Sequence, residues 1–292
     1  MIMKKYLPAF CTGKGGYNFM PIKNNTTAMN VVIFTSNAIR HMYVANMLAE
    51  RADRALIVSE CKPHDTLSFE GDKTSVQKHF QLRYETERAF FAGHDVFSAS
   101  TLPILHKEVN MPYVYEVVKK FKPTMAYVFG SWIIKDPLLS LIPQGKFINL
   151  HLGLSPYYRG SGTNFWPFVN KELEYVGATI LHIDSGIDTG DILAHVVPQF
   201  EENDTVHTIG CKVIRESART LVHVMGMVRA GKTLPRTPQW EVQESHYYRS
   251  RDFNEEALAR YYENLHGGMI GEYIRAPKKS PRLIFLEDEP RI

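Results

Sequence analysis

The sequence predicts an α/β fold: a doubly wound, mostly parallel sheet with a Rossmann-like core and a small C-terminal extension. Short apolar runs rich in β-branched residues, such as Asn30–Thr35 and Ala55–Ser59, are typical of strands buried in parallel sheets. Segments with helical spacing separate these runs, and this alternation is the pattern of βαβ units. The 292 residues, 44% of them hydrophobic, suffice for one large domain with a smaller addition.

The first βαβ unit occupies residues 30–59. Ser36 and Asn37 are expected to cap its helix, which runs over 41–51. The turn after the first strand reads TSNAIRH and lacks the GxGxxG pattern of dinucleotide-binding folds. We therefore exclude a nicotinamide enzyme.

The alternation of strands and helices continues to residue 230. Residues 65–100 are polar with helical spacing, and Asp136-Pro137-Leu-Leu marks the start of an apolar helix. The length and capping of residues 205–230 predict a long helix. The other expected elements are a helix over 114–121 and strands over 125–129, 146–151, 177–183 and 191–197.

Three parts of the chain are expected: an N-terminal extension (1–28), a core domain (29–234) and a C-terminal extension (235–292). Pro235-Arg-Thr-Pro238 is interpreted as a linker, and a helix is expected over 254–265. The C-terminal extension also holds an aromatic cluster of Trp240, Tyr247 and Tyr248. Its role stays open between a hydrophobic cover for the core and a surface that stacks on a base.

Charge and composition exclude several classes of protein. The 34 Lys and Arg against 31 Asp and Glu give a formal charge of +3, too small for a nucleic-acid-binding surface, so no nucleic-acid partner is expected. The cysteines Cys11, Cys61 and Cys211 form no CxxC, which argues against a disulfide framework. No apolar run approaches the roughly 18–20 residues of a membrane span, and the start is a poor signal peptide. We expect a soluble, cytoplasmic protein with no membrane partner.

The candidate site lies at the end of the strand over 146–151. Alternate side chains of a strand share a face, so Asn149 and His151 lie on one side at its carboxyl end, where open α/β sheets bind ligands. Asp188 follows in the turn Ser185-Gly-Ile-Asp-Thr-Gly-Asp191. An amide can stabilise an oxyanion, an imidazole can move a proton, and a carboxylate can orient the imidazole. This set suits acyl transfer to an amine.

The wider pattern resembles the 10-formyltetrahydrofolate-dependent formyltransferases, most closely the sugar N-formyltransferases. The ordered motif is Asn149-x-His151, Pro156, Arg159-Gly160, Gly177-Ala-Thr-Ile and Asp184-x-Gly-x-Asp188-Thr-Gly190. The resemblance is strong over residues 125–195 and extends to element order over 30–125. It implies that the core domain is a formyltransferase catalytic domain, with 10-formyltetrahydrofolate as the formyl donor.

The resemblance also implies a role for each matching residue. Asn149 corresponds to the catalytic amide that holds the formyl oxygen, His151 to the proton-transferring imidazole, and Asp188 to the catalytic acid. The folate pteridine would lie against two segments: Phe129, Gly130, Ser131, Trp132, Ile133 and Ile134, and Asp184, Ser185, Gly186, Ile187 and Asp188. Gly153 and Ser155 depart from the Ser and Leu that are common in the family, which affects the shape of the acceptor loop.

The acceptor is inferred from the C-terminal extension. From Arg236 it holds nine Lys and Arg against ten Asp and Glu, whereas methionyl-tRNA formyltransferases carry a basic, domain-sized module there. We therefore expect the primary amine of a nucleotide-linked amino sugar as the acceptor, as in O-antigen or other lipopolysaccharide biosynthesis. The alternatives are an enzyme like the methionyl-tRNA or glycinamide ribonucleotide formyltransferases, and a non-catalytic folate- or nucleotide-binding module. A homodimer stays open.

No metal site is expected. The spacing of Asp184, Asp188 and Asp191 lacks the order of a calcium loop, and His182 and His195 are interpreted as core or edge histidines. Trp132 and Trp166 are interpreted as packing residues, because aromatic side chains most often fill cores.

Overall fold

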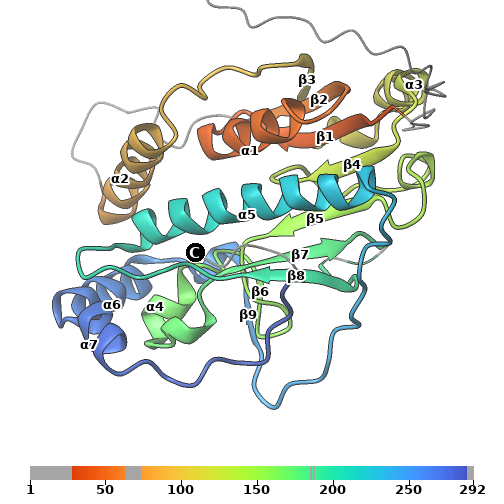
Figure 1. Cartoon of the computed structure of the whole chain (residues 1–292). Helices are drawn as coiled ribbons and strands as arrows, with labels where there is room; N and C mark the ends of the chain where they lie inside the picture. Colours follow the sequence, from red (N-terminus) through yellow and green to blue (C-terminus); the bar gives the residue numbers. More distant parts are fainter. Residues whose placement is uncertain (1–27, 63–73, 185, 187, 288–292) are drawn as a thin grey trace, which may run out of the picture.

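A seven-stranded sheet organises the chain in the computed structural model, which describes residues 28–62, 74–184, 186 and 188–287 (Figure 1). The strands in spatial order are β3 (Ser100–Leu105), β2 (Arg54–Cys61), β1 (Asn30–Ser36), β4 (Met125–Val128), β5 (Phe147–His151), β7 (Ala178–His182) and β8 (Ile192–Val196). Strands β1 to β5 are parallel, and β7 is antiparallel to both of its neighbours, β5 and β8. The predicted doubly wound, mostly parallel sheet is confirmed.

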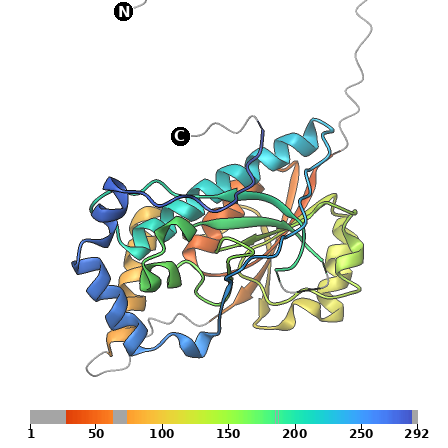
Figure 2. The ribbon, with the colours of Figure 1, turned by 90° about the horizontal axis from the view of Figure 1, so that it is seen from below.

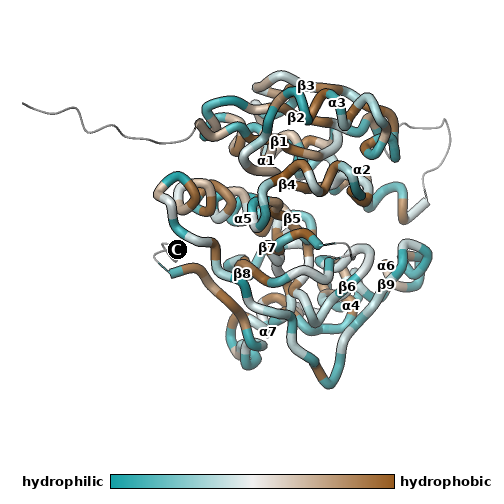
Figure 3. Tube along the Cα trace, turned by 90° about the vertical axis from the view of Figure 1, so that its right-hand side faces the viewer, coloured by the Kyte–Doolittle hydropathy of each residue, from teal (hydrophilic) through white to brown (hydrophobic). Residues whose placement is uncertain are grey.

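Helices cover both faces of this sheet. Helices α1 (Ile39–Ala49), α2 (Ser75–Phe90) and α5 (Val206–Arg229) lie on one side, and α3 (Pro112–Phe121) lies on the other, as Figure 2 shows for α5 and α3. Alternate residues of β1 serve the two cores, because Ile33 packs under α1 and α5 while Phe34 packs under α3. In Figure 3 the hydrophobic positions are concentrated along the central strands.

Capping residues were predicted for the helices over 41–51 and 205–230, and one of the two predictions is wrong. Thr205 accepts a hydrogen bond from the main-chain N–H of Thr208 and begins α5, as predicted. Ser36 and Asn37 do not cap α1, because its N-cap is Ala38. The Ser36 hydroxyl instead bonds His41 Nδ1 at 2.6 Å, and the Asn37 amide bonds the main chain of Lys62.

Several elements depart from the sequence prediction. The segment 65–100 contains α2, as its helical spacing predicted. The edge strand β3, which begins at residue 100 and has the sequence STLPIL, was not predicted. The apolar helix expected at Asp136 is wrong, because only a single 3-10 turn, Leu139–Leu141, forms there. A further helix, α7 (Met269–Arg275), follows α6 (Glu255–His266), which matches the predicted helix over 254–265.

The C-terminal segment packs onto the core rather than leaving it. Thr237, inside the expected linker, pairs antiparallel with Ile192 of β8. Further on, β9 (His246–Tyr248) forms a two-stranded sheet with β6 (Tyr158–Gly160). The ring of Tyr248 stacks on Trp166 of α4 (Trp166–Asn170) at 3.9 Å between centroids, whereas Tyr247 is exposed. Trp166 is therefore the packing residue that was predicted.

No helix in the described ranges is long and apolar enough to cross a membrane.

Candidate active site

Asn149, His151 and Asp188 come together at the carboxyl end of β5. The Asn149 amide donates to Asp188 Oδ1 at 2.8 Å, and His151 Nδ1 lies 3.2 Å from Asp188 Oδ2. One carboxylate thus contacts both the amide and the imidazole. The sequence predicted these three residues, and the structure brings them together. We refer to Asn149, His151 and Asp188 as the triad.

Strand pairing explains how a residue so distant in sequence reaches the strand end. Asn149 and His151 of β5 lie opposite Leu181 and Thr179 of β7, so the turn after β7 returns beside Asn149. Asp184 holds this turn by accepting from the Thr189 hydroxyl at 2.9 Å. Asp188 itself has a left-handed backbone with φ of +52°, which is uncommon for a residue other than glycine.

Gly190, two residues after Asp188, is required by packing. A Cβ atom at Gly190 would lie 1.7 Å from the carbonyl oxygen of His182, so no other residue fits without moving the strand. Asp188 is therefore held in its turn from both sides, by the Asp184 side chain before it and by the close approach of Gly190 after it.

His151 is 8% exposed, and its two ring nitrogens have different surroundings. Nδ1 faces Asp188, whereas Nε2 is buried and has no hydrogen-bond partner among the described residues. A Cβ at Gly153 would lie 2.9 Å from this Nε2 and 2.6 Å from Thr163 Cβ, and Gly153 has φ of +149°. The small residue at 153 thus keeps open the space in front of the imidazole.

The segment 129–134, predicted to hold the pteridine, begins and ends in the core. Phe129 and Ile134 are buried, whereas Ile133 and Trp132 are exposed, Trp132 to 40%. The prediction that Trp132 packs in the core is therefore wrong. Its ring is instead covered by the Lys107 ammonium at 4.8 Å from the centroid, at the protein surface.

Glu60 at the end of β2 fixes this segment, and the sequence analysis did not identify it. Its side chain is fully buried, and one carboxylate oxygen accepts from Trp132 N at 2.6 Å and from Ser131 Oγ at 3.1 Å. The other oxygen lies 2.7 Å from His106 Nδ1. A buried charge with this many partners on one loop determines the loop's path.

The structure describes only part of 184–188, the second segment predicted to lie against the pteridine. Asp184 and Gly186 are exposed, and the main-chain N–H of Gly186 donates to Asp184 Oδ1 at 3.0 Å. Ser185 and Ile187 lie outside the described residues.

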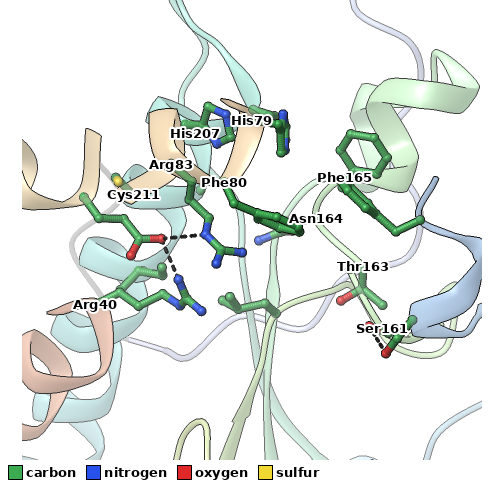
Figure 4. Close-up of a pocket in the computed structure, with 18 of the residues that line it drawn as sticks. Arg40, His79, Phe80, Arg83, Ser161, Thr163, Asn164, Phe165, His207 and Cys211 are labelled. Carbon is green, nitrogen blue, oxygen red and sulfur yellow. Dashed lines mark hydrogen bonds and ion pairs between the residues drawn. The ribbon is translucent and has the colours of Figure 1, made fainter. Parts of the chain in front are cut away.

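A cavity of about 800 Å³ lies beside α5, which contributes His207 and Cys211 to its wall (Figure 4). Two of its lining residues lie next to the site: Leu152 follows His151 in sequence, and Thr163 lies beside Gly153. Its walls come from segments far apart in the sequence, including Arg40, Arg83, Phe165, His207 and Phe253. A volume of this size is typical of small-molecule sites.

Two arginines meet in this cavity around a single carboxylate. Arg40 Nη1 lies 2.7 Å and Arg83 Nε 3.7 Å from Glu87 Oε1, and both ion pairs are drawn as dashed lines in Figure 4. Arg40 and Arg83 thus bring two guanidinium groups to one side of a partly enclosed space. The cavity is therefore suited to an anionic group.

The imidazoles of His79 and His207, which lie near Arg83 in the same cavity, are uncharged at neutral pH. Burial lowers the pKa of His79 to about 4 and that of His207 to about 3, and the neighbouring Arg83 adds to both effects. His207 Nε2 is buried and has no hydrogen-bond partner among the described residues. Besides its arginines, the cavity thus offers the neutral imidazoles of these two histidines. It also offers the aromatic rings of Phe80, Phe165 and Phe253.

A second cavity, of about 350 Å³, lies on the α3 side. Phe147, Ile183 and Asp184 line it, together with Asp136 and residues 139–140 and 142–145. Phe147 precedes Asn149 by two positions on β5, so this cavity and the Asn149 amide lie on the same face of the strand. Asn149, His151 and Asp188 are not among the residues that line either cavity, and the two cavities share no lining residue. Leu152, which follows His151, lines the larger cavity, and Phe147, two positions before Asn149, lines the smaller one.

The remaining histidines of the sheet match the sequence analysis. His182 and His195 are buried, and His195 Nε2 lies 2.8 Å from the carbonyl oxygen of Ser155. Within the described part of the chain, no group of three or more His, Cys, Asp or Glu side chains is arranged to hold a metal ion.

Comparison with known proteins gives matches in sequence and in fold. Methionyl-tRNA formyltransferase of Pelotomaculum thermopropionicum is 34% identical over 123 residues, which are 42% of this chain and 39% of that protein. The chain matches about two fifths of the length of such curated relatives. A 4-N formyltransferase from Francisella tularensis has the same fold, with a TM-score of 0.52 and 18% identity over 90% of this chain and 98% of that one.

A second solved structure shares the fold: an N-formyltransferase from Helicobacter canadensis in complex with folinic acid and dTDP-3-aminofucose. Its TM-score is 0.50, with 16% identity over 82% of this chain and 81% of that one. The family model for formyl transferases matches residues 29–225, a range that contains Asn149, His151 and Asp188. The resemblance to formyltransferases is thereby confirmed, and the chain belongs to the formyl transferase family.

Proposed function

We propose that this protein transfers a formyl group from 10-formyltetrahydrofolate to the primary amine of a nucleotide-linked amino sugar. One observation carries the proposal: Asp188 contacts both Asn149 and His151 at the carboxyl end of β5. Neighbouring residues of this segment line two separate cavities, and the larger one combines arginines with aromatic walls. The donor occupies one side and the acceptor the other, so the amine meets the formyl carbon at Asn149 and His151.

The triad divides the chemistry among its members. The acceptor amine attacks the formyl carbon, and a C–N bond forms while the carbonyl oxygen becomes an oxyanion. The Asn149 amide stabilises this charge. His151 Nε2, which faces the open space beside Gly153, receives the amine proton, and Asp188 stabilises the resulting imidazolium. The bond to N10 of the folate then breaks, and the proton passes to that nitrogen.

The donor side is supported by the smaller cavity and by the segment that Glu60 fixes. The cavity is lined by Phe147, Ile183 and Asp184, and Phe147 shares a strand face with Asn149, so we expect a formyl group carried there to be directed toward the amide. Main-chain groups of 129–134 and of the Asp188 turn supply fixed hydrogen-bonding partners for a pteridine ring. The folinic acid bound by the Helicobacter canadensis protein of the same fold is consistent with this assignment.

The acceptor side is supported by charge and enclosure. The diphosphate of a sugar nucleotide is an anion that Arg40 and Arg83 bind well. Ser250 and Phe253 of the C-terminal segment add a wall, and Ser250 Oγ bonds Ser161 Oγ at 3.2 Å across the rim. The product is a formamido sugar nucleotide, a precursor suited to O-antigen or other surface glycans.

A tRNA acceptor is the second candidate, because the curated relatives matched in sequence are methionyl-tRNA formyltransferases. The described part of the C-terminal segment is packed on the core through Gln239, Tyr248 and α6, and its side chains help to close the acceptor cavity. This favours a small acceptor over a large one.

An acceptor screen tests the proposal. Purified protein is given 10-formyltetrahydrofolate and dTDP-, UDP- or GDP-linked amino sugars, methionyl-tRNA or glycinamide ribonucleotide, and tetrahydrofolate release is measured. We expect turnover with at least one sugar nucleotide and none with methionyl-tRNA. Turnover with methionyl-tRNA alone contradicts the sugar acceptor, and folate binding without turnover of any amine indicates a binding module.

The arginines give a prediction on acceptor affinity. Arg40→Gln should raise KM for the active sugar nucleotide about 10- to 100-fold, because a charge-assisted hydrogen bond contributes about 1.5–3 kcal/mol. The KM for the folate donor and kcat should change less than about threefold. Steady-state kinetics against both substrates check this.

Arg219→Gln is the matched control, because Arg219 pairs with Glu216 on the exposed side of α5 outside the cavity. It should leave both KM values unchanged. A fall in kcat of Arg40→Gln without a change in acceptor KM would contradict the assignment of this cavity.

A further inference from the structure

Gln239 of the C-terminal segment bonds the main chain of the turn that carries Asp188. Its amide Nε2 donates to the carbonyl oxygen of Asp188 at 2.7 Å and to that of Gly190 at 3.0 Å. Its Oε1 accepts from Arg159 Nη2 at 3.0 Å. One side chain thus uses both of its donors on the Asp188 turn and its acceptor on Arg159 of β6.

The surrounding segment holds Gln239 in register with that turn. Two residues earlier, Thr237 exchanges main-chain hydrogen bonds with Ile192 at 2.7 and 2.9 Å. Before that, Arg236 Nε lies 2.9 Å from Asp191 Oδ2. Residues 236–239 therefore run antiparallel along the end of the turn and the start of β8, and Gln239 reaches Asp188 from a fixed backbone.

The conformation of Asp188 makes this contact consequential. An aspartate with φ of +52° is in an unfavourable backbone region, and the peptides around it rotate unless neighbouring groups hold them. The carbonyl that Gln239 bonds belongs to the same residue whose carboxylate contacts Asn149 and His151. Rotation of that peptide would move the carboxylate away from His151.

We propose that Gln239 is a positioning residue for the catalytic carboxylate, through which the C-terminal segment completes the active site. This inference rests on the proposed function for its kinetic readout. Gln239 does not touch the reacting atoms in this assignment. It acts through Asp188, and Arg159 acts on Gln239 by fixing the orientation of its amide.

Gln239→Met removes the donors at nearly constant size, and Gln239→Glu replaces them with a carboxylate that repels the two carbonyls. Both variants should lower kcat about 10- to 100-fold, the effect of displacing a catalytic group by about 1 Å, with each KM within about threefold of wild type. In the Asp188→Asn background, Gln239→Met should lower kcat less than about twofold further, because the group it positions is already lost.

Asn264→Leu is the matched control. Asn264, in α6, likewise donates its Nδ2 to two core carbonyls, those of Phe168 and Val169, both at 3.0 Å, but these lie in α4 and not in the Asp188 turn. It should lower Tm about as much as Gln239→Met does and leave kcat unchanged. The comparison separates loss of an amide between the segment and the core from loss of Asp188 positioning.

A measurement without turnover keeps the inference separate from the proposed function. The ring signals of His151 are followed by NMR and assigned with His151→Gln. Gln239→Met should shift these signals toward their positions in Asp188→Asn, and Asn264→Leu should leave them in place. Unshifted signals, or an undiminished effect of Gln239→Met on kcat in the Asp188→Asn background, overturn the inference. Absence of turnover in the wild type overturns the proposed function alone, and the NMR result then decides.

Discussion

Asp188→Asn is expected to lower kcat by about 10²- to 10⁴-fold, the range that proton transfer by a positioned side chain contributes. The carboxylate accepts from the Asn149 amide through one oxygen and faces His151 Nδ1 through the other. An asparagine has a single acceptor oxygen, so its NH2 group must point at one of these two donors. The imidazolium also loses its negative partner. We therefore expect this change to have the largest kinetic effect.

The measurement is kcat with saturating donor and acceptor, together with the affinity for a folate analogue, which should stay within about threefold of wild type. Asp53→Asn serves as a control, because Asp53 pairs with Arg229 at 3.2 Å at the opposite end of the sheet. It should leave kcat unchanged. Turnover of Asp188→Asn close to that of the wild type would remove Asp188 from the proposed mechanism.

Local sequence was sufficient to predict the strands and helices that support the triad. The apolar runs over β1, β4 and β5 and the capping of α5 depend on neighbouring residues, and the structure confirms them. Strand alternation likewise assigned Phe147 and Ile148 to opposite faces, and they lie in two different cores. Strand β3 was missed because Pro103 stands among its apolar residues, and a proline argues against a central strand but is tolerated at a sheet edge.

The larger cavity could not be predicted in this way. Its walls combine Arg40, Arg83, Thr163, His207 and Phe253, which come from five segments and share no motif. Only the packing of α1, α2, α5 and the C-terminal segment brings them together. In the sequence an arginine on the surface of a helix and one that lines a ligand cavity have the same pattern.

Two further features of the structure were not predicted from the sequence, for a similar reason. Glu60 was part of the end of a strand with no signal of its own, yet its carboxylate fixes the segment around Trp132. Pro235–Pro238 has the composition of a linker, but main-chain pairing of Thr237 with Ile192 holds it against the sheet. Gln239 follows directly, so its contact with Asp188 depends on pairing between residues about fifty positions apart, which local composition does not encode.

Asn149→Ala is the second change with a large expected effect, a fall in kcat of about 10²- to 10³-fold. An amide has two N–H donors, and Asn149 uses one on Asp188 Oδ1 at 2.8 Å, which fixes the plane of the group. The other donor is then held in a constant direction for the oxyanion. Because this charge exists only in the transition state, its loss should lower kcat and leave folate affinity nearly unchanged.

Asn46→Ala is the control for removing a bonded asparagine. Asn46 is buried in α1, where its amide donates to the carbonyl oxygen of Val96 at 2.8 Å and accepts from Ser98 N at 2.9 Å. It should lower Tm and leave kcat within about twofold, because it contacts neither cavity nor triad. If Asn149→Ala instead raised the KM for the donor with kcat unchanged, Asn149 would bind the ground state, and the oxyanion would need another donor.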